Sequence, residues 1–182
     1  MTGYDFDKTI YDGDSFIDFY FYCLLKRPYL FLLLPFQLIF ILFTFYNKKL
    51  LKQTFAVYLI FVYKKEDLIE SFWNKNMSKI KDWYFRQKKE DDIIISASPY
   101  FLLEPICKRI GVTKLIATNM NIKSGIITGK NCYGEEKAVQ FKKQFPNETL
   151  SAFYSDSKSD LYMIAISNNG YIIDKDTFLK VK

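Results

Sequence analysis

Short apolar runs alternate with helix-like segments over the second half of the chain, and this alternation limits the folds available to it. Runs typical of buried strands occupy residues 92–98, 114–120 and 150–156, and a shorter run occupies residues 2–6. Helical patterns follow at residues 99–111, 135–145 and 159–167. Strands that alternate with helices predict an α/β fold with a doubly wound, Rossmann-like parallel sheet.

Residues 15–90 interrupt this pattern, because they are helix-like, aromatic and basic. We therefore expect a core formed by residues 1–14 and 91–182, with residues 15–90 inserted after the first strand as a helical cap. A chain of 182 residues suits one domain with such an insertion. Apolar residues make up 49% of the chain, which is ample for a buried core.

Polar residues gather where the predicted strands end, and ligands of such sheets bind beyond the carboxyl ends of the strands. The residues expected there, with one lysine from the helix between them, are Asp5, Asp7, Ser96, Lys137, Asp156 and Asp160. Carboxylates from distant segments repel one another unless a cation lies between them. Oxygen ligands suit Mg²⁺, and a lysine and a serine beside that metal suit the oxygens of a phosphate.

The absence of histidine removes the commonest general base and the commonest zinc ligand. The three cysteines, Cys23, Cys107 and Cys132, lie far apart without a CxxC pair, which favours reduced thiols in a cytosolic compartment. Acidic residues precede the first long apolar run, so we expect no secretory signal. The expected location is the cytoplasm, with peripheral attachment to the inner face of the membrane as an open alternative.

Four short motifs occur in an order that resembles the haloacid-dehalogenase-like phosphohydrolases. DFDKT at residues 5–9 resembles the DxDxT motif, and Ser96 in IIISAS resembles the second motif. Lys137 in GKNCYGEEK resembles the third motif, and SDSKSD at residues 155–160 resembles the acidic fourth motif. Within this superfamily, the chain most resembles the phosphoserine-phosphatase-like branch, subfamily IB, whose insertion lies between the first and second motifs.

The resemblance implies the chemistry of the acidic residues. Asp5 would be the nucleophile and would form an aspartyl-phosphate. Asp7 would be the general acid for the leaving group and then the base for the hydrolytic water. The metal Mg²⁺ would be held by Asp5, the main-chain carbonyl of Asp7 and Asp156, and Asp160 would support that shell.

The resemblance also implies which residues bind the substrate. Ser96, Lys137 and the backbone N–H of Phe6 would hold the phosphoryl oxygens, and Thr9 would steady this phosphate-binding loop. Asp14 lies where the phosphoserine-type enzymes carry an acidic residue that meets the substrate amine. Asp14 is therefore a substrate-selecting residue if the substrate carries an amine, and otherwise a cap for the first helix of the insertion.

The expected function is Mg²⁺-dependent hydrolysis of a small or lipid phosphomonoester through an aspartyl-phosphate. One alternative is a membrane-docked lipid phosphatase of the phosphatidylglycerophosphatase type. Another is a non-catalytic module that binds a membrane or a partner protein and keeps the same fold.

Residues 28–46 contain no charged side chain, and Lys26, Arg27, Lys48 and Lys49 flank them. By length and flanks this run qualifies as a transmembrane candidate. A single span would separate the first motif from the other three, which must share one site. The run is therefore either the buried core of a helical cap or a hairpin that dips into one leaflet.

The excess positive charge lies in the insertion. Residues 26–90 carry 13 Lys plus Arg and 5 Asp plus Glu, a net of +8, whereas the remaining residues have a net of −2. This charge fits either a solvated basic face or docking to anionic lipid headgroups. No nucleic-acid-binding motif accompanies the charge, so we expect no nucleic-acid partner.

Overall fold

The structure of the protein is a computed structural model, and it describes residues 1–175 and 177–182. The main strands and helices are β1 (Thr2–Tyr4), α1 (Ser15–Lys26), α2 (Leu34–Thr44), α3 (Lys48–Ala56), α4 (Lys65–Asn76), α5 (Asp82–Gln87), β2 (Ile93–Pro99), α6 (Tyr100–Arg109), β3 (Lys114–Thr118), α7 (Glu135–Gln144), β4 (Ala152–Ser155), α8 (Leu161–Ile166), β5 (Gly170–Asp174) and β6 (Thr177–Lys180). Short 3-10 helices are η1 (Pro28–Leu33), η2 (Val57–Phe61), η3 (Met77–Lys79) and η4 (Lys158–Asp160).

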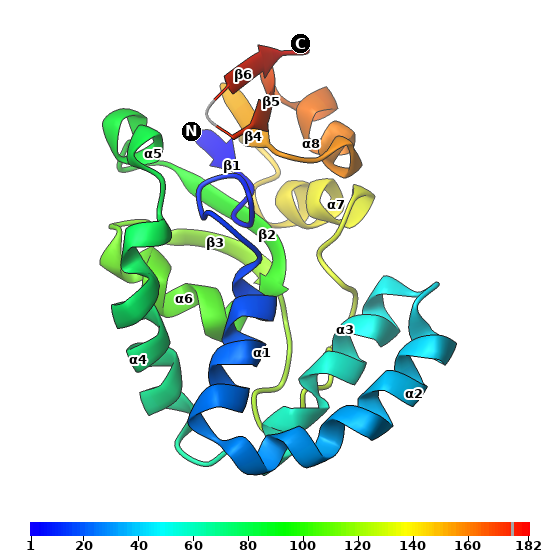
Figure 1. The fold of residues 1–182 in the computed structure, drawn as a ribbon. Coiled ribbons are helices and arrows are strands. Elements are labelled where there is room, and N and C mark those ends of the chain that lie inside the picture. Colours follow the sequence, from blue (N-terminus) through cyan, green and yellow to red (C-terminus); the bar gives the residue numbers. More distant parts are fainter. Residues whose placement is uncertain (176) are drawn as a thin grey trace.

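A six-stranded sheet in the order β3-β2-β1-β4-β5-β6 forms the centre of the molecule (Figure 1). Strands β1 to β5 are parallel, and β6 pairs antiparallel with β5 at the edge. The chain runs outward from β1 to β3 and then returns to the other side of β1 with β4. Ligands of such sheets bind where the strand order reverses, which here is the end of β1 and β4. The sheet confirms the predicted α/β fold.

Helices cover both faces of the sheet, because successive side chains of a strand point to opposite faces. Ile94 belongs to a cluster of buried apolar side chains that includes residues of α1, α4, α5 and α6. Ile93 and Ile95 belong to a second cluster, which includes residues of α7 and α8. Two hydrophobic layers therefore sandwich the sheet.

Part of the insertion belongs to the first of these layers. Trp73 of α4 is fully buried, and its Nε1 donates to the backbone oxygen of Leu102 in α6 at 2.7 Å. Its ring meets Phe6 of the first motif edge to face, with the centroids 5.9 Å apart. Residues 15–90 thus comprise helices that pack on the sheet, namely α1, α4 and α5, and a hairpin of α2 and α3 that covers neither face of it (Figure 1).

The apolar run at residues 28–46 forms η1 and α2, and it is mostly exposed. Only Leu30 and Gln37 within it are buried. The exposed apolar side chains, which we call the hairpin surface, are Tyr29, Phe31, Leu32, Phe36, Leu38, Ile39, Phe40, Leu42, Phe43, Phe45 and Tyr46. The interpretation of this run as the buried core of a cap is therefore wrong, because most of its apolar side chains are exposed and the main packing partners of α2 are η1 and α3.

Within the described part of the chain, no single helix has both the length and the apolar character to cross a bilayer. One bent pair, Ser15–Lys26 with Pro28–Thr44 at 115°, meets the criterion by length and composition alone.

Candidate active site

The first motif begins at the end of β1. The backbone N–H of Asp5 donates to the carbonyl oxygen of Tyr154 in β4 at 2.9 Å, which fixes Asp5 where the strand order reverses. Lys8 adopts a left-handed conformation with φ of 58°, and its N–H donates to the carbonyl oxygen of Gly13 at 2.9 Å. This tight loop directs Asp5 and Asp7 into one cavity of about 410 Å³.

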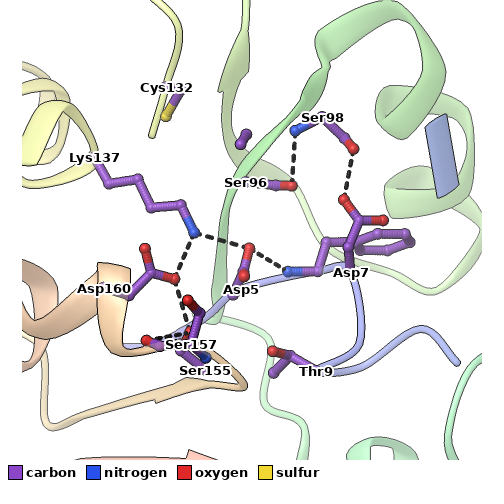
Figure 2. Close-up of polar contacts among 12 residues, drawn as sticks. Asp5, Asp7, Thr9, Ser96, Ser98, Cys132, Lys137, Ser155, Ser157 and Asp160 are labelled. Carbon is purple, nitrogen blue, oxygen red and sulfur yellow. Dashed lines mark hydrogen bonds and ion pairs between the residues drawn. The ribbon is translucent and has the colours of Figure 1, made fainter. Parts of the chain in front are cut away.

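Lys137, in the first turn of α7, lies between two carboxylates (Figure 2). Its Nζ is 2.9 Å from Oδ1 of Asp5 and 2.7 Å from Oδ2 of Asp160. Ser155 Oγ also donates to Oδ2 of Asp160 at 2.7 Å. The side chain of Lys137 is only 2% exposed, so these contacts are almost completely shielded from solvent.

Burial and charge oppose each other in this group. Burial raises the pKa of Asp5 above its ordinary value, although the neighbouring Lys137 lowers it. Burial alone would lower the pKa of Lys137, but the carboxylates of Asp5 and Asp160 raise it above its ordinary value. Lys137 therefore remains a cation, and it supplies positive charge beside the Asp5 carboxylate.

Asp7 points away from Lys137 and is held by two donors (Figure 2). The N–H of Ser15, the first residue of α1, donates to Oδ1 at 2.7 Å. The hydroxyl of Ser98 in β2 donates to Oδ2 at 2.5 Å. Burial, followed by the charge of Asp14, raises the pKa of Asp7, while both serines lower it. Raised carboxyl pKa values are common in residues that exchange a proton during catalysis.

The phosphate-binding candidates are not all on the cavity wall. Lys137 lines the cavity, whereas Ser96 is fully buried outside it, and its Oγ accepts from the N–H of Ser98 at 3.1 Å. The N–H of Phe6 donates to Asp5 Oδ1 at 2.8 Å, and the Phe6 side chain is in the core. Thr9 is also fully buried and outside the wall.

A hydrogen bond ties the fourth motif to the first. The N–H of Asp156 donates to the hydroxyl of Thr9 at 2.9 Å, and Asp156 itself lines the cavity. Burial raises the pKa of Asp156. Asp160, four residues later, is buried, and its carboxylate contacts Lys137 and Ser155.

Asp14 combines both features that the sequence suggested for it. Its Oδ1 accepts from the N–H of Ile17 at 3.0 Å, so it caps the N-terminus of α1. Asp14 also lines the cavity. A contact with a substrate amine stays a prediction.

Several cavity residues escaped the sequence reasoning. They are Ser98, Lys48, Lys52, Asn131 and Tyr133. Ser96 and Ser98 are the two serines of the SAS stretch at residues 96–98. They differ only in the direction of their side chains, which the sequence does not indicate. The lysines come from the α2–α3 hairpin, where no sequence pattern distinguishes them from the other basic residues of the insertion.

The donors around the cavity fit a hard cation, although they are not drawn together into a ready site. Among residues 1–175 and 177–182, no three His, Cys, Asp or Glu side chains form a group that could hold a metal ion. Asp5, Asp7 and Asp156 nevertheless line one cavity and offer only oxygen atoms, which suits Mg²⁺. Burial opposes the charged form of all three, and a divalent cation would favour it.

Comparisons with known proteins find a relative that is named a probable phosphatase. The chain is 33% identical over 98 residues to the probable phosphatase Rv3661 of Mycobacterium tuberculosis, which covers 50% of this chain and 34% of that protein. The chain therefore spans less than half the length of the curated relatives it matches.

Solved structures share the fold. A protein of unknown function from Bordetella pertussis matches with a TM-score of 0.72 and 16% identity, over 93% of this chain and 87% of that one. A probable phosphoserine phosphatase from Vibrio cholerae matches with a TM-score of 0.59 and 12% identity, over 93% of this chain and 55% of that one. Residues 2–165 match the profile of haloacid dehalogenase-like hydrolases. Since this match includes nearly the whole chain, the protein belongs to the haloacid dehalogenase-like hydrolase family.

Proposed function

We propose that the protein is a Mg²⁺-dependent phosphomonoester hydrolase that acts through an aspartyl-phosphate. The observation that carries the proposal is the convergence of Asp5, Asp7 and Lys137 on one cavity. Asp5 is paired with a cation, and Asp7 is held apart from that cation by neutral donors. Two carboxylates in such different surroundings are suited to different roles. The phosphatase named among the relatives supports the same reaction class.

The first step joins Asp5 to the substrate. A carboxylate oxygen of Asp5 attacks phosphorus, the bond from phosphorus to the leaving oxygen breaks, and Asp7 gives its proton to that oxygen. Lys137 offsets the charge that gathers on the phosphoryl oxygens. Ser98 and the N–H of Ser15 orient the Asp7 carboxyl for this transfer.

The second step releases phosphate. Asp7, now ionised, takes a proton from water, and the oxygen of that water attacks phosphorus while the bond to Asp5 breaks. When bound, Mg²⁺ would be held by Asp5, the main-chain carbonyl of Asp7 and Asp156, and it would reduce the repulsion between the carboxylate and the phosphate dianion.

An aryl phosphate assay tests this proposal. We expect turnover with Mg²⁺ and none after chelation, and we expect Asp5→Asn to lower kcat by at least about 10³-fold. Asp12→Asn is a matched control, because Asp12 is exposed in the same loop and does not line the cavity. Full turnover by Asp5→Asn, or turnover that is independent of metal, would contradict the proposal.

The exposed hairpin surface favours a second proposal, namely that the protein docks on an anionic membrane at the inner face of the bilayer. A contiguous apolar surface of this kind rarely faces water in a soluble monomer. Lys26, Arg27 and Lys49 flank it and would meet anionic headgroups. A docked enzyme would act on a lipid phosphate, whereas the phosphatase with a small-molecule substrate needs no docking.

Flotation with vesicles at low salt separates these cases. We expect binding to vesicles with about 30% anionic lipid and weaker binding to zwitterionic ones. Leu38→Ser/Leu42→Ser should reduce binding, because both side chains are more than 60% exposed on α2. Leu161→Ser, at an exposed position on α8, is the control. Absence of binding by the unaltered protein rejects docking. Binding together with complete inactivity on every phosphate would instead favour the non-catalytic module.

A further inference from the structure

One face of α3 forms a wall of the active-site cavity. Residues at helical spacing lie on the same side of a helix, and the four that line the cavity are Lys48, Leu51, Lys52 and Phe55. The side chains of Phe45, Phe16 and Ile17 line the cavity as well. The insertion therefore contributes apolar surface and two ammonium groups to the cavity that holds Asp5 and Asp7.

Lys52 differs from Lys137 in its hydrogen-bond partners. Its Nζ donates to the carbonyl oxygen of Ala97 at 2.5 Å and to Oδ1 of Asn131 at 3.0 Å, and both acceptors are neutral. Across the residues that the structure describes, Lys52 forms no ion pair, whereas Lys137 pairs with Asp5 and Asp160. An ammonium group has three donors, so Lys52 retains one N–H for another acceptor.

Burial makes this arrangement of the Lys52 ammonium costly. Burial lowers the pKa of Lys52 to about 8, although the charges of Asp7 and Asp14 raise it. A cation that is largely removed from water is favourable only when an anion or further hydrogen bonds compensate for the lost hydration. Asp7 and Asp14 line the same cavity as Lys52, so Lys52 shares that cavity with the acid that serves the leaving group.

We propose, on the basis of the proposed function, that Lys52 binds a second anionic group on the leaving group of the substrate. The substrate class is a phosphomonoester whose alcohol carries a carboxylate or a phosphodiester. Lys137 and Asp5 act on the transferred phosphoryl group, and Lys52 meets the second charge. The carbon skeleton between the two charges packs on Phe45, Leu51 and Phe55.

Matched substrate pairs test the charge and its source. The soluble pair is glycerol 3-phosphate and 3-phosphoglycerate, which differ by a carboxylate in place of a hydroxymethyl group. The lipid pair, in detergent micelles, is phosphatidate and phosphatidylglycerophosphate, which differ by a glycerol unit joined through an anionic phosphodiester. We expect at least one pair to show about a 10-fold or larger preference in kcat/KM for the second anion, the range of a charge-assisted hydrogen bond. The pair that shows it identifies a small-molecule or a lipid substrate.

Variants assign the preference to Lys52. Lys52→Met should abolish the preference, mainly by raising KM for the doubly charged substrate. Lys52→Arg should retain most of the preference. Lys75→Met controls for the loss of a lysine in the insertion, because Lys75 is exposed and outside the cavity. A thermal unfolding curve verifies that each variant is folded.

A second measurement needs no variant: in the soluble case glycerate should inhibit aryl phosphate turnover at a concentration at least about 10-fold lower than glycerol. Equal rates on the two members of each pair, with aryl phosphate still hydrolysed, would overturn the proposed role of Lys52. The proposed phosphatase function would then still stand. An equal loss on every substrate in Lys52→Met would also overturn the proposed role of Lys52, because Lys52 would then act on the phosphoryl group. Inactivity of the unaltered protein toward aryl phosphate and all four probes would overturn the proposed function itself.

Discussion

Removal of Lys137 should destabilise the folded protein by several kcal/mol, because two buried carboxylates depend on it. The Nζ of Lys137 is 2.9 Å from Oδ1 of Asp5 and 2.7 Å from Oδ2 of Asp160. The side chain of Lys137 is 2% exposed, that of Asp5 is 11% exposed and that of Asp160 is 1% exposed. In Lys137→Met the apolar stem is largely preserved, so the change acts mainly on charge.

The magnitude follows from the geometry. At these distances each ion pair has a Coulomb energy of about 6 kcal/mol at an effective dielectric constant of about 20. Desolvation of the three charges opposes most of this energy, and the removal of one partner from a buried pair typically costs about 3–5 kcal/mol. We therefore expect the free energy of unfolding to fall by about 3–5 kcal/mol at pH 7.

Urea unfolding measures this loss, with Lys143→Met as the control, since Lys143 is exposed on the same helix. The double variant Lys137→Met/Asp160→Asn should be more stable than Lys137→Met, because it removes one of the uncompensated charges. A loss below about 1 kcal/mol in Lys137→Met, or no recovery in the double variant, would refute the reasoning.

The loss should also depend on pH. Burial raises the folded-state pKa of Asp5 above the unfolded value of about 4, and loss of the Lys137 charge removes the main influence that lowers it. A raised carboxyl pKa destabilises the folded state above the unfolded pKa, and this effect fades as pH falls toward that value. The difference in unfolding free energy between Lys137→Met and the unaltered protein should therefore be smaller at pH 5 than at pH 7. A constant difference over this interval would contradict the electrostatic origin of the loss.

Three further predictions concern the same cavity. Ser98→Ala removes the hydroxyl that donates to Asp7 and should lower kcat about 10-fold in the aryl phosphate assay with little change in KM, so an unchanged kcat would count against its orienting role. Thr9→Val leaves the N–H of Asp156 without its acceptor and should lower the free energy of unfolding by about 1–3 kcal/mol, whereas unchanged urea denaturation would show that this bond is dispensable. Chelation by EDTA should abolish turnover, and added Mg²⁺ should restore it while Ca²⁺ should not, because Mg²⁺ requires a tighter octahedral arrangement. Full restoration by Ca²⁺ would contradict the assignment of the metal.

The sequence predicted the elements that depend on local pattern. The apolar runs at residues 92–98, 114–120 and 150–156 are strands β2, β3 and β4 within one residue or two at each end. This agreement has a physical reason, because a strand buried on both faces needs a continuous apolar run, whatever the rest of the chain does. The rule that parallel strands carry their ligands at one end predicted that six residues would converge there. Asp5, Asp7, Lys137 and Asp156 line one cavity, whereas Ser96 and Asp160 are buried outside its wall.

Contacts between distant segments were beyond such patterns. In the SAS stretch both serines suit a strand end, and only the local bend of β2 decides that Ser98 contacts Asp7 while Ser96 is buried behind it. Lys52 is one of many basic residues in the insertion, and only the position of α3 brings it to Ala97.

The sequence by itself therefore determined the α/β fold, the order of the four motifs and the acidic, histidine-free chemistry, because these depend on residue type and short-range periodicity. The tertiary structure alone decided where the insertion lies. An uncharged, apolar helix has the same sequence pattern whether it is surrounded by protein or lies outside the protein core. Only the packing of α1, α4 and α5 on the sheet, and of α2 on η1 and α3, leaves the run at residues 28–46 on the outside.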